Sequence, residues 1–251
     1  MLAAMKARFL AVALLLLATP LSGARADPPV TPAPRAPVVV ELYTSQGCSQ
    51  CPRANRLLGE FSREEGVIAL TFPVGYWDYL GWIDTFAQPE FTARQRAFSR
   101  SLRMRAPFTP QLVIDGMRQV SAADWDESRA AMQWVQGQSA VPASPSLSVR
   151  RLPSGLVRIT IGAGEARSGA VDVWLISYDP GPLNVLIRGG ENANRMVSHY
   201  NLVRRVTRIG SWNGQATWFE RPRCTPECAV IVQQTSGGRI LAAAMTRRER
   251  H

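Results

Sequence analysis

The feature that most constrains this chain is a pair of cysteines placed where a strand turns into a helix. The apolar run Val38-Val-Val-Glu-Leu-Tyr43 predicts a buried strand, and Thr44–Gly47 predicts a turn before Cys48-Ser-Gln-Cys51. Pro52 follows at once and suits a first helical turn. Because the N–H groups and dipole of a helix N-terminus stabilise a thiolate, we expect Cys48 to act as the nucleophile. Cys51, about one turn further in, is expected to resolve the mixed disulfide.

The rest of the N-terminal half follows the order β-α-β-α-β-β-α, which is the order of a thioredoxin-like domain. After the helix that ends near Gly66, the expected elements are a strand at 67–72, a helix at 91–104, a strand at 111–114, a return strand at Val120 and a helix at 124–135. Thr109 and Pro110 directly precede the third strand. In thioredoxin-like domains a cis-proline at this place faces the cysteines and presents backbone to a peptide. We therefore predict that Thr109 and Pro110 bind substrate.

An aromatic segment lies between the second strand and the second helix of this pattern. Tyr76, Trp77, Tyr79 and Trp82 flank Asp78 there. One interpretation is a substrate-facing wall beside the cysteines, with Trp77 and Asp78 as binding residues and the carboxylate tuning the thiols. The other is that the aromatic rings bury an insertion against the sheet, because rings of this size bury much apolar area.

The pattern of apolar residues changes after Ser139. Short runs with period-two alternation and turn signals between them predict antiparallel strands, one of them at 197–209. The sequence therefore predicts an α/β thioredoxin-like domain at 38–140 followed by an all-β antiparallel sandwich domain at 145–246. A Pro-rich linker is expected at 27–37, and a disordered tail at 247–251.

The first 26 residues have the three parts of a secretory signal peptide. Lys6 and Arg8 form a basic start, 9–18 is an apolar run, and Ala24-Arg-Ala26 matches a small-x-small cleavage site. The apolar run spans about half of the roughly 20 residues that a membrane helix needs. We expect cleavage of residues 1–26, no membrane span afterwards, and a periplasmic or secreted location.

The charge of the chain excludes some functions. Lys6 is the sole lysine, so lysine Schiff-base or general-base chemistry is excluded once the leader is removed. The formal net charge of the full sequence is +10, but the arginines are scattered along it. Scattered charge is typical of a solvated surface, and together with export it makes nucleic acid an unexpected partner.

Four cysteines in an exported chain are expected to be paired or redox-active. Cys224 and Cys228, here called the C-terminal pair, are interpreted as a local structural disulfide. Three hypotheses stay open for Cys48 and Cys51: disulfide exchange with protein thiols or disulfides of the cell envelope, binding of copper by soft thiolates, and an inert disulfide. A zinc site would need distant ligands such as His199, which is otherwise interpreted as hydrogen-bonded packing. No metal site and no organic cofactor are predicted.

Several blocks of the chain are similar to those of one protein family. They are Glu41–Pro52, Tyr76–Trp82, Phe91–Arg96, Thr109–Gln111, Gly190–Asn192 and Ser198–Asn201. Through them the chain resembles a family of secreted bacterial proteins, the domain of unknown function DUF1223, which has a thioredoxin-like fold. The resemblance covers nearly the whole chain after the leader and implies the fold and export, while the activity of the family is not established.

The chain departs from the family pattern beside the aromatic segment. Pro73 and Gly75 stand where the pattern has His and Asp, and Ile83 stands where a lysine is frequent. Any family role of those side chains in proton transfer or metal binding is therefore not carried over, whereas both cysteines and Pro110 are retained. The leading hypothesis is a periplasmic thiol–disulfide oxidoreductase-like protein. The alternative is a non-catalytic envelope binding module whose cysteines bind copper or form a structural disulfide.

Overall fold

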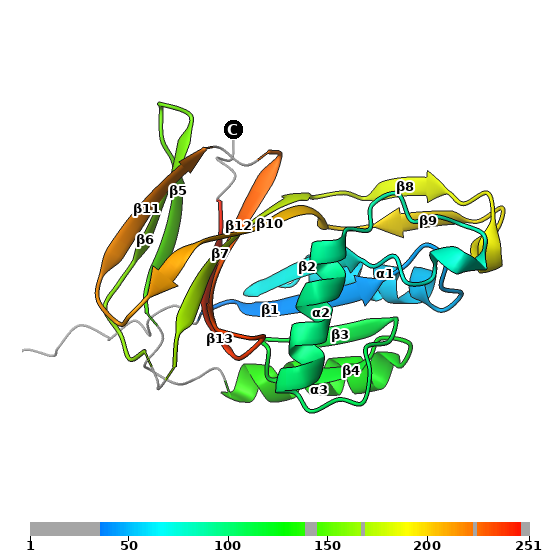
Figure 1. Ribbon diagram of the computed structural model, residues 1–251, viewed down its shortest axis with the longest axis horizontal. Helices are drawn as coiled ribbons and strands as arrows, with labels where there is room; N and C mark the ends of the chain where they lie inside the picture. Colours follow the sequence, from blue (N-terminus) through cyan, green and yellow to red (C-terminus); the bar gives the residue numbers. More distant parts are fainter. Residues whose placement is uncertain (1–35, 139–144, 167–168, 223–224, 247–251) are drawn as a thin grey trace, which may run out of the picture. The chain divides into compact units, whose positions relative to one another are not determined.

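Strands make up most of the regular structure of the chain (Figure 1). The computed structural model describes residues 36–138, 145–166, 169–222 and 225–246. The predicted signal peptide, most of the predicted linker and the predicted tail lie outside the described residues and stay predictions. No helix in the described part of the chain is long and apolar enough to cross a membrane.

The described elements are as follows. The strands are β1 (Val38–Thr44), β2 (Val67–Pro73), β3 (Gln111–Ile114), β4 (Arg118–Ser121), β5 (Leu147–Arg151), β6 (Leu156–Ile161), β7 (Val171–Asp179), β8 (Leu183–Leu186), β9 (Met196–His199), β10 (Leu202–Trp212), β11 (Thr217–Pro222), β12 (Glu227–Gln234) and β13 (Ile240–Met245). The helices are α1 (Cys51–Phe61), α2 (Pro89–Ser101) and α3 (Trp125–Gln138), with 3₁₀ turns η1 (Asp78–Leu80) and η2 (Gly190–Asn192).

A large mixed sheet of eight strands organises the molecule, in the order β13-β12-β7-β10-β2-β1-β3-β4. β1 pairs in parallel with β2 and antiparallel with β3. β10 joins β2 in parallel, with Leu202 opposite Thr71. The hydrogen bonds of one sheet therefore run through both halves that the sequence analysis had separated, a junction it did not predict.

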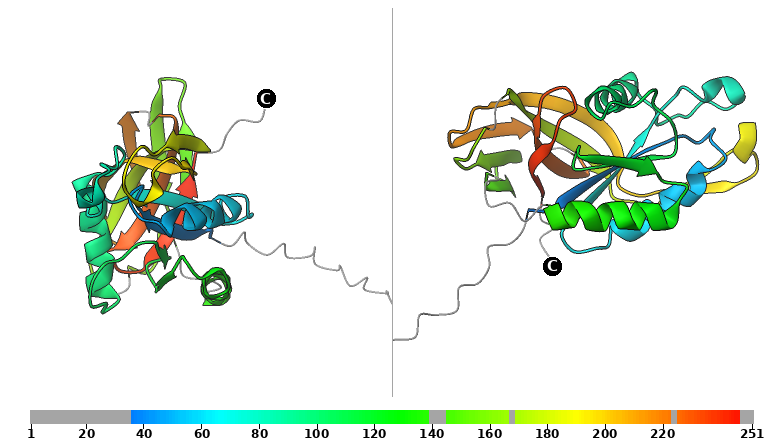
Figure 2. Two further views of the ribbon diagram at one scale, coloured as in Figure 1. Left: turned by 90° about the vertical axis from the view of Figure 1, so that its right-hand side faces the viewer. Right: turned by 90° about the horizontal axis from the view of Figure 1, so that it is seen from below.

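The central strand β1 is buried along its length and mostly apolar because both of its faces are covered. Val38, Val40 and Leu42 point into a core with α1 and α3, whereas Val39 and Tyr43 point into a core with α2 and the strands of the C-terminal half. Successive side chains of a strand lie on opposite faces, so a strand buried twice cannot alternate apolar and polar residues. Figure 2 shows α1 and α3 on one side of the sheet and α2 on the other.

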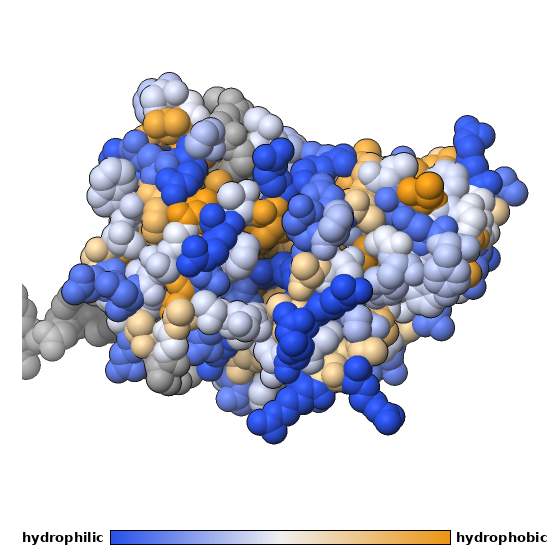
Figure 3. All heavy atoms as spheres, viewed as in Figure 1, coloured by the Kyte–Doolittle hydropathy of each residue, from blue (hydrophilic) through white to orange (hydrophobic). Residues whose placement is uncertain are grey.

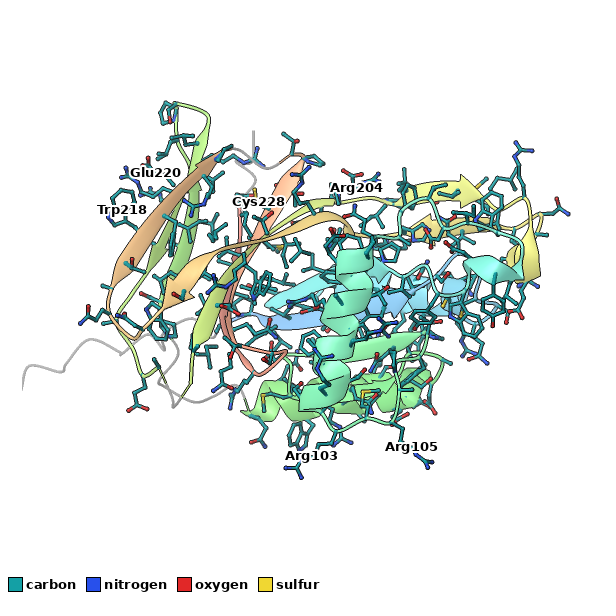
Figure 4. The ribbon with its side chains drawn as sticks, viewed as in Figure 1. Arg103, Arg105, Arg204, Trp218, Glu220 and Cys228 are labelled. Atoms are coloured by element: carbon teal, nitrogen blue, oxygen red, sulfur yellow. The ribbon has the colours of Figure 1, made fainter. Side chains whose placement is uncertain are left out.

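A second sheet of three strands, β11-β6-β5, packs on the C-terminal part of the large one. β6 alternates buried and exposed residues, and Ile159 and Ile161 enter a core with Val173 and Val230 of the large sheet. Trp218 and Glu220 lie on the outer strand β11 (Figure 4). This sheet lies at the end of the molecule away from α1 (Figure 1).

The prediction of one continuous strand at 197–209 is wrong. The chain breaks at Tyr200 and Asn201 between β9 and β10, with φ of Asn201 at +44°. The amide of Asn201 donates to the carbonyl of Ala69 at 2.8 Å, and the hydroxyl of Thr71 donates to the carbonyl of Tyr200 at 2.6 Å. These bonds to β2 replace the continuation of a straight strand, and they separate the end of β9 from the large sheet.

Candidate functional site

The two cysteines lie at the N-terminal end of α1, as the pattern predicts. Cys48 ends a tight turn in which its N–H donates to the carbonyl of Ser45 at 3.2 Å, and the N–H of Cys51 donates to the carbonyl of Cys48 at 3.1 Å. Both are free thiols, and Cys48 is 5% exposed whereas Cys51 is fully buried. The helix begins at Cys51 itself, after Gln50 as N-cap. The expectation that Cys51 lies one turn into the helix is therefore corrected.

The surroundings of Cys48 favour its thiolate. A hydrogen bond from the thiol of Cys51 is the main cause that lowers the pKa of Cys48 to about 6, and burial opposes it. The hydroxyl of Thr109 and the backbone N–H groups of Gln50 and Cys51 lower the pKa further. Hydrogen bonds to the charged form favour that form. At neutral pH most of Cys48 is therefore nucleophilic.

Cys51 has the opposite character. Burial is the main cause that raises the pKa of its thiol well above the ordinary value, and the neighbouring Cys48 raises it further. The hydroxyl of Thr44 and the N–H of Ser45, which lies 3.5 Å from Cys51 Sγ, oppose this rise. Cys48 is therefore the ionised cysteine of the pair, and the fully buried Cys51 is the protonated one.

Of the predicted substrate-binding residues, Thr109 interacts with Cys48, and Trp77 reaches it through Thr109. The Thr109–Pro110 peptide is cis, and β3 begins at the next residue. The indole N–H of Trp77 donates to Thr109 Oγ1 at 2.6 Å. Because the oxygen of Thr109 accepts this bond, its hydroxyl hydrogen is left for the sulfur of Cys48.

The other aromatic residues of the segment lie in different surroundings. Tyr76 lies close enough to both thiols that their charges add to burial, the main cause, in raising its pKa to about 12. Tyr79 stacks on Trp77 and is 77% exposed. Trp82 instead donates its indole N–H to the side chain of Gln46, in the turn before the cysteines, at 2.7 Å. Part of the segment thus lines the cysteine turn and part of it faces outward.

Asp78 reaches the cysteine turn through a second carboxylate. Its Oδ1 accepts the N–H of Asp84 at 3.1 Å, and Oδ2 of Asp84 accepts the N–H of Gln46 at 2.8 Å. Burial raises the pKa of Asp84 to about 6, and the charge of Asp78 adds to the rise. Asp78 could be predicted from the sequence, whereas Asp84 has no motif of its own, although it lies directly after the aromatic segment.

The C-terminal half supplies residues to the same turn, through η2. The buried amide of Asn192 donates to the carbonyls of Gln46 and Cys48, at 2.9 and 2.8 Å. The carboxylate of Glu191 accepts the N–H of Ser49 at 3.1 Å. Sequence reasoning gave these residues no function, although Gly190–Asn192 was one of the blocks that carry the family resemblance.

His199 also comes to α1, at the end of β9. Its side chain is fully buried, and its Nδ1 lies 3.4 Å from Nδ2 of Asn55 on the helix. Burial is the main cause that lowers the pKa of His199 to about 4, and the charge of Arg204 adds to it. The imidazole is therefore neutral at physiological pH.

Cys228, one cysteine of the C-terminal pair, lies apart from these residues in the fold. Cys228 is buried on β12, in the core that the large sheet shares with the three-stranded sheet (Figure 4). Cys224 lies outside the described residues, so the disulfide between them stays a prediction. No cluster of three or more His, Cys, Asp or Glu side chains that could hold a metal ion occurs within the described ranges.

Comparison with known proteins identifies the family. The model of the family described as "Protein of unknown function (DUF1223)" matches residues 39–233, and the chain belongs to this family. A solved structure, protein AGR_C_4864 from Agrobacterium tumefaciens, is 29% identical and superposes with a TM-score of 0.72 over 87% of this chain and 100% of its own. HBP35 of Porphyromonas gingivalis has a similar fold at 13% identity, with a TM-score of 0.58 over 84% of this chain and 74% of its own.

A curated relative is similar to a short part of the chain. It is a "Probable Thioredoxin" of Archaeoglobus fulgidus, 40% identical over 37 residues, which are 15% of this chain. The match spans 41% of the length of that relative.

Proposed function

We propose that this protein is a thiol–disulfide oxidoreductase of the bacterial cell envelope, in which a thioredoxin-like unit at 38–140 is joined to a β-sandwich at 145–246. The observation that carries the proposal is the placement of two free thiols at the start of α1, where the N–H of Cys51 donates to the carbonyl of Cys48. Cys48 has a pKa of about 6, and Cys51 has a raised pKa. A thiolate is the attacking species in disulfide exchange. Cys48 is therefore able to attack a substrate, and Cys51 stays protonated until the mixed disulfide has formed.

The proposed reaction has two exchange steps. The thiolate of Cys48 attacks one sulfur of a substrate disulfide, and the other substrate sulfur leaves as a thiolate with the electron pair of the broken bond. Cys51 then loses its proton and attacks Cys48 Sγ, which releases the first substrate sulfur as a second thiolate. Cys48 and Cys51 end as a disulfide, so two electrons pass from the protein to the substrate, and the reverse sequence oxidises a substrate dithiol.

The residues around Cys48 support a polypeptide substrate. The hydroxyl of Thr109 interacts with the sulfur of Cys48, and the indole N–H of Trp77 donates to the oxygen of that hydroxyl. A "Probable Thioredoxin" among the relatives agrees with such a reaction. The sequence pattern of residues 1–26 supports export to an oxidising compartment. We propose that the partners are protein thiols or disulfides of the periplasm or the secreted medium.

Exchange kinetics with a disulfide-containing peptide test the proposal. Purified protein lacking residues 1–26, with both cysteines of the C-terminal pair replaced by serine, is expected to exchange disulfides catalytically. Cys48→Ser is expected to lower the rate to the uncatalysed background. Cys51→Ser is expected to accumulate a mixed disulfide on Cys48, visible as an added peptide mass.

Two outcomes would contradict the proposal. One is a Cys48→Ser variant that exchanges disulfides as fast as its parent. The other is a reduced parent that exchanges no disulfide yet binds one Cu(I) ion per chain, which would favour the envelope binding module instead.

A further inference from the structure

One face of α1 is covered by the end of β9, and the resolving cysteine lies on that face. Cys51, Asn55 and Gly59 are four residues apart and therefore share a side of the helix. His199 lies against Asn55, and the ring of Tyr200 lies over Gly59. A Cβ at position 59 would be 2.7 Å from a ring carbon of Tyr200, so glycine permits this close approach. The C-terminal half thus contacts the helix one turn beyond the buried sulfur.

A chain of polar side chains leads from His199 to that sulfur. Thr44 Oγ1 donates to Asn55 Oδ1 at 2.8 Å, and the same hydroxyl is a hydrogen-bond donor to the thiolate of Cys51. The amide nitrogen of Asn55 faces Nδ1 of His199. An amide nitrogen only donates, so Nδ1 is the acceptor and the ring proton of the neutral imidazole lies on Nε2.

This arrangement leaves an N–H group without a partner. Nε2 of His199 is buried and has no hydrogen-bond partner within the described ranges. A buried donor without a partner is destabilising, and such a group in a folded protein calls for a reason. When the amide nitrogen of Asn55 faces His199, Nδ1 must accept and the proton of the ring must be on Nε2. The orientation of Asn55 therefore explains why the imidazole has an unpaired N–H.

Two acceptors compete for the single hydroxyl hydrogen of Thr44. While Cys51 is a thiol, the hydroxyl of Thr44 donates its hydrogen bond to Asn55 Oδ1. When Cys51 ionises, the hydrogen can turn to the sulfur, and the bond to Asn55 is then lost. If the amide of Asn55 turned round, its NH₂ group would donate to Thr44 Oγ1 and the hydrogen would remain on Cys51.

We propose that His199 is a positioning residue for Cys51: by fixing the amide of Asn55, it holds the hydroxyl hydrogen of Thr44 away from the sulfur and keeps the resolving thiol protonated. This role rests on the proposed exchange function, in which Cys51 waits as a thiol until the mixed disulfide has formed. Because Asn55 Oδ1 competes for the hydroxyl hydrogen of Thr44, the thiolate of Cys51 is less stable than it would be with burial as the single unfavourable factor. The loss of that competition is therefore expected to make Cys51 more acidic.

Other ionisable groups also act on Cys51 or His199. Cys48 and Tyr76 interact electrostatically with Cys51, and Arg204 acts on His199. The titration of Cys51 is therefore best measured in a Cys48→Ala background, with both cysteines of the C-terminal pair replaced by serine. Tyr76 and Arg204 are then common to every variant compared.

The test compares two polar replacements of the histidine. His199→Asn keeps an oxygen near the place of Nδ1, where it can accept from Asn55, whereas His199→Gln keeps polar atoms near Nε2 and none near Nδ1. Ultraviolet absorbance of the thiolate reports the ionisation of Cys51. His199→Gln is expected to increase its acid dissociation constant about tenfold, which is one pKa unit, and His199→Asn is expected to leave it within about twofold.

Variants of Asn55 and Thr44, which lie between His199 and Cys51, are expected to change the acid dissociation constant of Cys51 in opposite directions. Asn55→Leu removes the competing oxygen and is expected to act as His199→Gln does. Thr44→Val removes the donor and is expected to decrease the acid dissociation constant of Cys51, and in that background His199→Gln is expected to have no effect. Because Asn55→Leu and Thr44→Val leave β9 untouched, they test the inference even if the variants of His199 do not fold.

The result that would overturn the inference is a shift of the same sign for Asn55→Leu and Thr44→Val. An equal shift for His199→Asn and His199→Gln would also overturn it. The titration does not require turnover, so its outcome is separate from that of the exchange assay. A protein that exchanges disulfides without these shifts contradicts the inference alone, and one that shows the shifts without exchange contradicts the proposed function alone.

Discussion

The segment from β8 to β9 and the three-stranded sheet β11-β6-β5 both come from the C-terminal half, but they contact the rest of the molecule through different groups. The first, here called the hairpin segment (183–199), reaches the cysteine turn and α1 through the buried polar side chains of Asn192 and His199. The second packs through apolar side chains such as Ile159, while its ion pair between Arg158 and Glu220 lies at the surface.

Their surfaces differ as well. Leu186 and Met196 face each other across β8 and β9 and are 42% and 61% exposed. Figure 3 shows apolar surface over this hairpin. The outer side of the three-stranded sheet carries Trp218, against which Arg158 packs. The C-terminal half therefore has two roles. Its apolar contacts stabilise the sheet, and its directional polar contacts shape the cysteine turn.

The largest expected effect tests the stabilising region. Ile159→Ala removes a fully buried side chain from the core of the three-stranded sheet and is expected to lower the free energy of unfolding by about 2–5 kcal/mol. The reduction potential of the cysteine pair is expected to stay unchanged. Chemical denaturation and glutathione equilibration measure the two quantities. Thr160→Ala, at the exposed neighbouring position, serves as the control, and a changed potential in Ile159→Ala would break the proposed division.

The next effect tests the hairpin segment. Asn192→Ala removes a side-chain donor from two backbone carbonyls of the cysteine turn and is expected to cost about 1–3 kcal/mol of stability. Unlike Ile159→Ala, it is expected to slow attack by Cys48 on a peptide disulfide as well. Asn184→Ala makes the same change at an exposed place on β8 and is expected to change neither quantity. Normal exchange kinetics in Asn192→Ala would contradict the role given to this segment.

The N-terminal site residues could be predicted because their relation is local. A strand, a turn and a proline-started helix fix where Cys48 and Cys51 lie, and Thr109 is found by its place before β3. The contribution of Asn192 and His199 could not be predicted in this way. It depends on the junction of β10 with β2 and on the break after β9, where side-chain bonds of Asn201 and Thr71 replace a straight strand. Alternation in the sequence gives strands but not their neighbours.

A smaller effect concerns the pH dependence of Cys48. Its pKa is lowered from 9.0 to about 6 in the folded protein, so ionisation stabilises the fold above the unfolded pKa. This contribution is lost as the pH falls from about 9 to about 6 and is absent below. Because the thiol of Cys51 is the main cause, Cys51→Ala is expected to raise the pKa of Cys48 by about one unit. Cys51→Ser keeps a hydroxyl donor and is expected to raise it less, as measured by thiolate absorbance.

The smallest effect concerns the hydroxyl of Thr109. Thr109→Val removes one of several donors to Cys48 and is expected to raise the pKa of that thiol by about half a unit. Trp77→Phe removes the N–H that orients the hydroxyl and is expected to have a weaker effect of the same sign. Titration of the reduced variants checks both, and a lowered pKa in either would show that the donor assignment is wrong.

The reduction potential of the Cys48–Cys51 pair tests the central claim most directly. It is measured by equilibrating the protein, without residues 1–26 and with both cysteines of the C-terminal pair replaced by serine, against reduced and oxidised glutathione. A catalytic pair is expected to have a potential between about −120 and −270 mV, the range of known exchange proteins. A potential below about −300 mV is typical of structural disulfides and would contradict the assignment of this pair as a catalytic centre.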